Sequence, residues 1–338
     1  MRAAVLRDGR MVCRDDVVEP VPGPGQVLVG VRACGICGSD LHFAQHGAEL
    51  LSQMARLEGM PTGDNIIDLS SDVFMGHEFS AEVLEAGPDT DAPPAGTLVT
   101  SIPVLLSATG FAPIVYSNTV LGGYAERMLL SVPLLLKIPN GLDAGHAALT
   151  EPMAVGLHAV NKSNIQRGET ALVLGCGPIG IAIIAALARR GVENIVAADF
   201  SAKRRELAVT MGAQEAVDPG AASPFDAATP AVVFEAVGVP GIVDDALRRA
   251  PSGTRVVVAG VSIQPDTVHP LYGIVKEVNI QFVWGYDPQE FAESLRAISD
   301  GEIDVTPLIT GEVGLNEIGA AFDELARPGA HCKILVTP

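Results

Sequence analysis

Hydrophobic and polar positions change their spacing near residue 155, so the chain divides into two kinds of predicted structure. Before this point short apolar runs are separated by turn residues. Residues 26–32 alternate after the Pro- and Gly-rich residues 20–25. Alternation predicts half-buried strands, and clustered Pro and Gly predict the turns between them. We therefore expect a β-rich domain at 1–154.

From about Thr170, apolar strands alternate with helices. Strands are predicted at 171–174, 194–198, 232–234 and 256–259, with helices ending near Arg190 and Met211. This order predicts a parallel sheet covered on both faces, that is, a doubly wound α/β domain at 155–285. Residues 286–338 are expected to return to the first domain, with helices at 288–298 and 315–325 and a strand at 333–336.

The turn after the strand predicted at 171–174 fits the pattern G-x-G-x-x-G. Its first glycine makes the turn, the second lets a pyrophosphate approach the backbone, and the third packs the helix on the strand. The helix N-terminus then offers N–H groups to the anion. A plain connection in another α/β protein is the alternative. The expected dinucleotide-binding residues are Gly175, Gly177, Pro178, Ile179 and Gly180.

Asp199 follows Gly180 by nineteen residues, at the end of the second predicted strand. A carboxylate there accepts hydrogen bonds from the adenosine ribose hydroxyls and repels a 2′-phosphate. The sequence therefore favours NAD(H). Arg204, between Lys203 and Arg205, is placed in the same cofactor site and leaves room for NADP.

The net charge of −18 excludes nucleic acid and anionic membranes as favoured partners, because both need clustered Lys and Arg. The uncharged stretches 92–125 and 171–188 are interrupted by Pro or Gly, so neither predicts a membrane span. Arg7 and Asp8 interrupt any secretory apolar region, and a cytoplasmic location is expected. A small molecule is the expected partner.

Upstream of the glycine turn lie G-I-C-G-S-D-L-H (35–42), G-H-E (76–78) and E-P (151–152). A thiolate, an imidazole and a carboxylate form a three-ligand set that leaves zinc a fourth position for water or substrate. Cys34 and Cys37 also fit C-x-x-C, the pattern of a dithiol redox protein. A dithiol redox protein would need neither the histidine of G-H-E nor the dinucleotide-binding turn.

With G-G-Y-A-E (122–126), E-P-M-A-V-G-L-H-A (151–159) and K-I-L-V-T-P (333–338), these motifs resemble the zinc-containing medium-chain alcohol and polyol dehydrogenases over nearly the whole chain. The resemblance implies a GroES-like catalytic domain, a Rossmann domain and a homodimer or homotetramer. It places Cys37, His77 and Glu151 as zinc ligands, with Glu78 as the alternative carboxylate. Asp40 then orients the ring of His77.

The same resemblance gives Ser39 the place of the hydroxyl that receives the alcohol proton. His42 takes the place of the imidazole that passes this proton to solvent. Many relatives carry four closely spaced cysteines that bind a structural zinc, but this chain has none between Cys37 and Cys176. We therefore expect one catalytic zinc and no structural zinc.

Forty positions separate Cys37 from His77, more than is usual in the family. Within this insertion, residues 43–75, Leu50, Leu51, Met54 and Leu57 recur at helical spacing. They predict either an added surface helix or a cap that lends the substrate pocket an apolar wall.

These observations favour zinc- and NAD(H)-dependent oxidation of a secondary or bulky apolar alcohol, or the reverse reduction. The alternative within the class is a polyol or sugar dehydrogenase. From other classes, a metal-free nicotinamide-binding sensor or scaffold and a dithiol redox protein stay open. The zinc content of the purified protein distinguishes a metal-free sensor or scaffold from an alcohol dehydrogenase.

Overall fold

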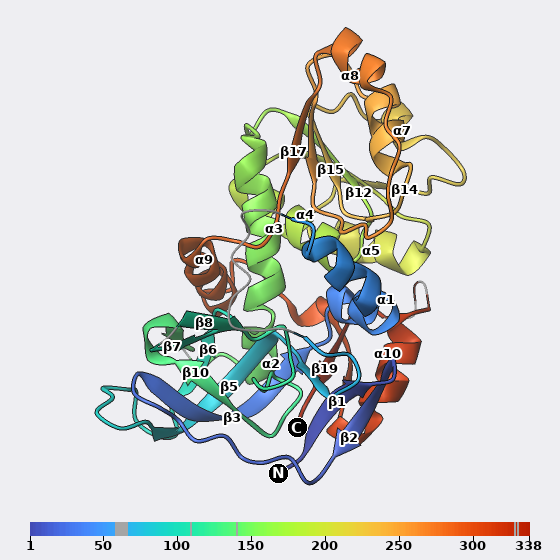
Figure 1. Cartoon of the computed structure of the whole chain (residues 1–338). Coiled ribbons are helices and arrows are strands. Elements are labelled where there is room, and N and C mark those ends of the chain that lie inside the picture. Colours follow the sequence, from blue (N-terminus) through green and yellow to red (C-terminus); the bar gives the residue numbers. More distant parts are fainter. Residues whose placement is uncertain (58–66, 109, 140, 328, 330) are drawn as a thin grey trace. The chain divides into compact units, whose positions relative to one another are not determined.

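The computed structural model describes residues 1–57, 67–108, 110–139, 141–327, 329 and 331–338 (Figure 1). They pack into two compact units, Met1–Glu151 with Ile309–Pro338, and Pro152–Leu308. Residues 286–308, which the sequence analysis assigned to the C-terminal segment, group with the second unit. Helix α9 (Pro288–Ser299) is held there, because Glu290 accepts a hydrogen bond from Asn161. The three domain boundaries drawn from the sequence stay predictions.

The first unit is centred on strand β3 (Gln26–Gly35). It pairs antiparallel with three segments that are distant in sequence: β5 (Glu78–Ala86), β10 (Arg127–Ser131) and β19 (Lys333–Val336). Strands β6 (Leu98–Ser101), β11 (Leu135–Lys137) and β18 (Ile309–Val313) complete this seven-stranded sheet. A second sheet has the order β2 (Arg10–Arg14), β1 (Ala3–Arg7), β4 (Val73–Met75) and β9 (Tyr116–Ser117), and β7 (Val104–Ser107) pairs with β8 (Gly110–Pro113).

The leucines of the insertion belong to the helix that begins beside Cys37. Helix α1 (Gly38–Met54) continues through a non-helical residue at His46, so the predicted added helix is its second half. Leu50 and Leu51 are half-buried against the apolar core of the first unit, whereas Met54 is 41% exposed. Residues 58–66 of the insertion lie outside the described residues. The packing of Leu50 and Leu51 on the core favours a surface helix over a cap on the substrate pocket.

The other helices of the first unit are short. Helix α2 (Ala144–Ala148) begins at Asp143, whose carboxylate accepts hydrogen bonds from the N–H groups of Gly145 and His146. This is a typical N-cap. The remaining ones are α10 (Ile318–Leu325) and the 3-10 helices Val132–Leu134 and Leu315–Glu317.

The second unit is a six-stranded parallel sheet with the order β14 (Glu215–Val217), β13 (Asn194–Ala198), β12 (Thr170–Leu174), β15 (Val232–Glu235), β16 (Arg255–Val258) and β17 (Asn279–Phe282). In chain order this is 3-2-1-4-5-6, the Rossmann arrangement. Its helices are α3 (Thr150–Ser163, from Pro152 onward), α4 (Pro178–Arg190), α5 (Ala202–Thr210), α6 (Pro224–Ala227), α7 (Ile242–Arg249), α8 (Pro270–Lys276) and α9, with a 3-10 turn at Thr306–Leu308. The predicted doubly wound fold is confirmed.

The uncharged stretch 171–188 forms a buried strand, the glycine turn and a buried helix, as predicted. Every residue of α4 from Gly180 to Leu187 is buried, and the helix ends at Gly191 with φ +79°. A left-handed glycine is a common helix stop. In the part of the chain that the structure describes, no helix is both long enough and apolar enough to span a membrane.

Candidate metal centre and dinucleotide site

Two loops at one end of the seven-stranded sheet bring the predicted metal ligands together. Gly35 is the register partner of Glu78, so Cys37 follows one strand and His77 directly precedes its neighbour. Donor atoms of Cys37, His77 and Glu78 all lie within 4.8 Å of one another. A thiolate, an imidazole and a carboxylate at this spacing are a donor set that zinc prefers.

The surroundings of His77 are anionic. Its Nδ1 lies 3.6 Å from Oδ1 of Asp40, and these two buried atoms have no hydrogen-bond partner among the described residues. Burial disfavours the charged imidazole, but Asp40, Cys37 and Glu151 outweigh burial and raise the pKa of His77 well above its ordinary value. A buried anionic cluster of this kind favours a bound cation, so the residues present fit a zinc ion.

Asp40 is fully buried and is fixed by two donors. The hydroxyl of Tyr124 donates to its Oδ2 at 2.6 Å, and the backbone N–H of Cys37 donates at 3.2 Å. The 3.6 Å separation from His77 is longer than a hydrogen bond, so the orienting role of Asp40 stays a prediction. The sequence analysis gave no role to Tyr124, although it lies in the G-G-Y-A-E motif.

The two candidate carboxylates have different environments. Glu78 is fully buried, and both of its oxygens accept hydrogen bonds from Nζ of Lys333 at 2.7 Å. Glu151 is half-buried in the first turn of α3, and its charge helps to raise the pKa of His77. Lys333 was given no role from the sequence, although it begins both the K-I-L-V-T-P motif and the apolar strand 333–336.

The two relay residues lie on α1. Ser39 hydrogen-bonds Tyr116, a half-buried tyrosine that stacks on Phe43 with ring centroids 3.9 Å apart. Partial burial and the neighbouring His46 lower the pKa of His42 below its ordinary value. No hydrogen bond between Ser39 and His42 is present among the described residues, so their relay stays a prediction. Tyr116 is a further residue that the sequence analysis missed.

The environment of Cys34 disfavours dithiol chemistry. Its side chain is fully buried, and burial raises the pKa of the thiol well above its ordinary value. A Cβ on Gly123 would lie 2.5 Å from its sulfur, so the thiol is closely packed. Cys34 therefore acts as a small core residue, and the nucleophilic thiolate that a redox pair needs is disfavoured.

In the second unit, each glycine of the G-x-G-x-x-G turn has a physical requirement. Gly175 has φ +90°, a conformation that residues with a side chain rarely adopt. A Cβ on Gly180 would lie 1.9 Å from the carbonyl oxygen of Gly175, so only glycine lets α4 pack there. A Cβ on Gly177 meets nothing within 4 Å, so space on its outer side is open for a ligand.

Asp199 is fixed at the end of β13. Its Oδ2 accepts a hydrogen bond from the N–H of Cys176 at 2.9 Å, and its Oδ1 accepts one from Ser201 at 2.8 Å. Arg204 approaches the carboxylate to 3.8 Å, and its buried Nε has no hydrogen-bond partner in the part of the chain that the structure describes. An anion-repelling carboxylate and an incompletely satisfied guanidinium therefore lie side by side.

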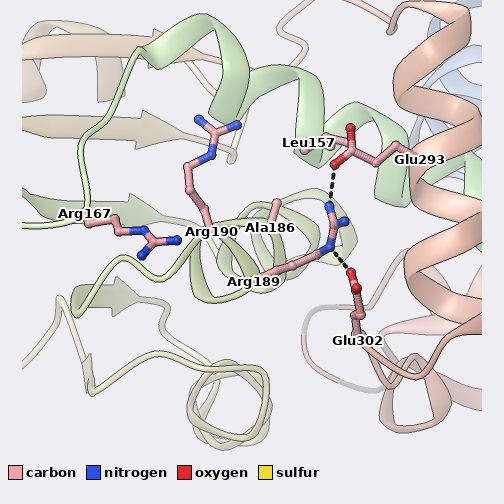
Figure 2. Close-up of a pocket in the computed structure, with 7 residues that line it drawn as sticks. All are labelled: Leu157, Arg167, Ala186, Arg189, Arg190, Glu293 and Glu302. Atoms are coloured by element: carbon pink, nitrogen blue, oxygen red, sulfur yellow. Dashed lines mark hydrogen bonds and ion pairs between the residues drawn. The ribbon is translucent and has the colours of Figure 1, made fainter.

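The second unit also contains a cavity of about 580 Å³ that includes none of the predicted site residues (Figure 2). Arg189 pairs with Glu293 and Glu302 there, and Arg190 donates to the carbonyl oxygen of Val160. Arg189 and Arg190 lie in the last turn of α4, where the helix dipole favours positive charge. Their arrangement is explained by capping and ion pairing, and we assign it no chemistry.

A second cluster of possible metal ligands, His158, Asp287 and Glu290, is also explained by local structure. Glu290 accepts hydrogen bonds from the backbone N–H of Asp287 at 2.8 Å and from Asn161 at 2.6 Å. Nδ1 of His158 lies 2.7 Å from the same carboxylate. This is a capping box at the start of α9. These hydrogen bonds occupy the carboxylate oxygens of Glu290 that a metal would need.

Comparisons with known proteins agree with this geometry. Residues 23–140 match the alcohol dehydrogenase GroES-like domain, and residues 178–300 match the zinc-binding dehydrogenase domain. The X-ray structure of 2R,3R-butanediol dehydrogenase from Bacillus subtilis is 29% identical with a TM-score of 0.82, covering 100% of this chain and 99% of that one. A putative zinc-binding dehydrogenase from Sinorhizobium meliloti 1021 bound to NADP is 29% identical with a TM-score of 0.83 and the same coverage.

Sorbitol dehydrogenase of Gallus gallus is 25% identical over 94% of this chain and 90% of its own length. The two domain matches lie in the two units in the order that the sequence motifs imply, and the relatives span nearly the whole chain. The chain is an oxidoreductase of the zinc-dependent alcohol dehydrogenase type that uses a nicotinamide cofactor. It belongs to the zinc-containing medium-chain alcohol and polyol dehydrogenase family.

Proposed function

We propose that this chain oxidises a secondary alcohol to a ketone with one catalytic zinc and NAD, or catalyses the reverse reduction. The observation that carries the proposal is the grouping of the half-buried Cys37 with the buried His77 and Glu78. Beside them, Nδ1 of His77 faces Asp40 and has no hydrogen-bond partner among the described residues. Zinc bound there would supply a Lewis acid that lowers the pKa of the alcohol hydroxyl. Cys37, His77 and Glu151 are its proposed ligands.

The proton of the alcohol needs a path to solvent. Ser39 is the proposed acceptor beside the metal cluster, because it follows Cys37 by two residues at the start of α1. His42 lies one turn further along the same helix, and its imidazole is exposed. We propose that it releases the proton to solvent.

Replacing His42 by Ala is expected to lower kcat/KM mainly near neutral pH and to matter little at high pH, where hydroxide takes the proton directly. Because the pKa of His42 is lowered, the wild-type imidazole is neutral and able to accept a proton at pH 7. The kcat/KM of the wild-type enzyme should therefore fall only below about pH 6.5, the ordinary pKa of histidine. Profiles of kcat/KM against pH test this, and an unchanged profile would remove His42 from the mechanism.

NAD is the proposed cofactor because the fixed carboxylate of Asp199 repels a 2′-phosphate. Asp199→Gly is expected to raise the KM for NAD by about tenfold, the scale of one lost charge-assisted hydrogen bond, and to improve NADP relative to NAD. Asp199→Asn is the matched control, since its amide oxygen still accepts from Cys176 or Ser201 while the charge is gone. A wild-type preference for NADP, to which Arg204 would then contribute, refutes the assignment.

The class of alcohol is tested by a panel of substrates followed by NADH absorbance. A simple secondary alcohol, a bulky aryl secondary alcohol, a vicinal diol and a hexitol distinguish the possibilities. The second candidate is a diol or polyol, favoured by the names of the butanediol and sorbitol dehydrogenases that the chain resembles. An apolar contribution from the insertion would have to come from Met54 and Leu57, since Leu50 and Leu51 pack on the core.

We also propose a homodimer or homotetramer. Strand β17 is an edge of the six-stranded sheet, and all four of its residues are exposed. Phe282 and Trp284 at its end are 67% and 80% exposed. An edge strand with apolar side chains is a template for pairing with a second copy. Light scattering after size-exclusion chromatography tests this, and a monomer at micromolar concentration contradicts it.

A cytoplasmic location stays part of the proposal, as does the absence of a structural zinc. Metal analysis separates the enzyme from a metal-free nicotinamide-binding sensor. One zinc per chain supports the enzyme, none supports the sensor, and two would overturn the one-zinc proposal.

A further inference from the structure

We propose that Lys333 determines which carboxylate the metal takes. By donating to both oxygens of Glu78, it occupies the atoms with which that carboxylate would bind the metal and leaves the third ligand position to Glu151. This inference rests on the zinc site proposed above and concerns how the site keeps one position open for the substrate.

Lys333 is fixed on all three of its ammonium protons. Nζ donates to Oε1 and Oε2 of Glu78, both at 2.7 Å, and to the carbonyl oxygen of Ile36 at 3.0 Å. An ammonium group has three donors, so none is left over. The side chain of Lys333 is 1% exposed and that of Glu78 is fully buried, so water does not compete for this pair. The lysine therefore acts as a rigid anchor.

Glu78 is near enough to the cluster to become a ligand without the anchor. One of its oxygens lies within 4.8 Å of donor atoms of both Cys37 and His77. Its present position depends on Gly35, because a Cβ there would lie 2.1 Å from Oε2 of Glu78. The carboxylate thus rests against a bare backbone segment on one side and the lysine on the other.

The balance of charge explains why Lys333 matters for the metal ligands. A zinc ion with the thiolate of Cys37 and the carboxylate of Glu151 forms a neutral set, and Glu78 with Lys333 forms a second neutral set. Without the lysine, Glu78 is a buried anion, which is costly unless it finds a positive partner. A zinc ion held by Cys37 and His77 would be such a partner, because Glu78 lies in the same group of donor atoms. Its binding of Glu78 would fill the position that the substrate needs and weaken the Lewis acid.

The test is Lys333→Met in the full chain, freed of metal with a chelator and reloaded with zinc or cobalt(II). Lys333→Arg keeps the charge, and the double variant Lys333→Met with Glu78→Gln removes both charges in similar volume. We expect Lys333→Met to bind zinc about tenfold more tightly, the scale typical of groups behind metal ligands. Its cobalt(II) visible bands should weaken as the coordination number rises, while both controls keep the wild-type affinity and spectrum.

The outcomes separate this inference from the proposed function. A wild-type chain that binds neither metal refutes the zinc site itself. A wild-type chain that binds metal, with Lys333→Met unchanged in affinity and spectrum, overturns only the role of Lys333. If metal-free Lys333→Met does not fold, restored folding on addition of zinc supports the inference and continued unfolding contradicts it.

Discussion

Cys37→Ala and His77→Ala are each expected to abolish zinc binding and to lower kcat/KM by about 1,000-fold or more, corresponding to about 4 kcal/mol of lost transition-state stabilisation. Each change removes one of the donor atoms grouped within 4.8 Å. Metal content by atomic emission and kinetics on the same preparations test this.

Cys13→Ala is the matched control, because Cys13 is a free cysteine outside the cluster. It should keep both zinc and activity. A metal-free preparation of the wild-type chain with full activity would contradict the zinc mechanism. The choice of carboxylate has its own criterion: zinc lost in Glu78→Gln but retained in Glu151→Gln would make Glu78 the third ligand.

The second large effect is expected in the glycine turn, where Gly180→Ala should lower stability and Gly177→Ala should lower the affinity for the cofactor. Gly180→Ala places a Cβ 1.9 Å from a backbone oxygen, and overpacking of this kind costs about 1–3 kcal/mol or more. The melting temperature should fall by about 5–10 °C, given the usual relation for a domain of this size. Gly177→Ala has φ −70° and nothing within 4 Å, so its melting temperature should stay unchanged.

Gly177→Ala should nevertheless raise the KM for the dinucleotide by about tenfold or more, because the added methyl group blocks the approach of the pyrophosphate to the backbone. Thermal melts and cofactor titration by NADH fluorescence measure the two effects separately. Normal cofactor affinity in Gly177→Ala would show that the pyrophosphate does not contact this turn.

Features with local causes could be predicted from the sequence. The strand, glycine turn and helix around Gly175 follow from apolar runs and from the steric freedom of glycine, and β13 and β19 have the predicted bounds. The grouping of Cys37 with His77 came from the order of the motifs. The structure adds the physical reason, which is the register of β3 against β5.

Partners that depend on distant contacts could not be predicted. Lys333 and Glu78 are 255 residues apart, and Tyr124 and Asp40 are 84 apart, so no local pattern joins them. The helical spacing of Leu50 and Leu51 indicated a helix, but it did not show that this helix is continuous with the one beginning at Gly38. Gly47, a residue that weakens a helix, lies between the two halves, directly after the kink at His46.

The discontinuity of the first unit sets an order on biosynthesis. Its central strand β3 is made early, but its partner β19 leaves the ribosome only after the whole of Pro152–Leu308 has been synthesised. Until then, the end of β3 at Cys34 and Gly35 has β5 on one side but no strand on the other, and the carboxylate of Glu78 lacks its lysine. Nascent chains therefore expose an open sheet edge and an unbalanced charge. Removal of residues 333–338 would leave every proposed metal ligand in place and would still remove the strand that pairs with the end of β3 and the lysine that pairs with Glu78.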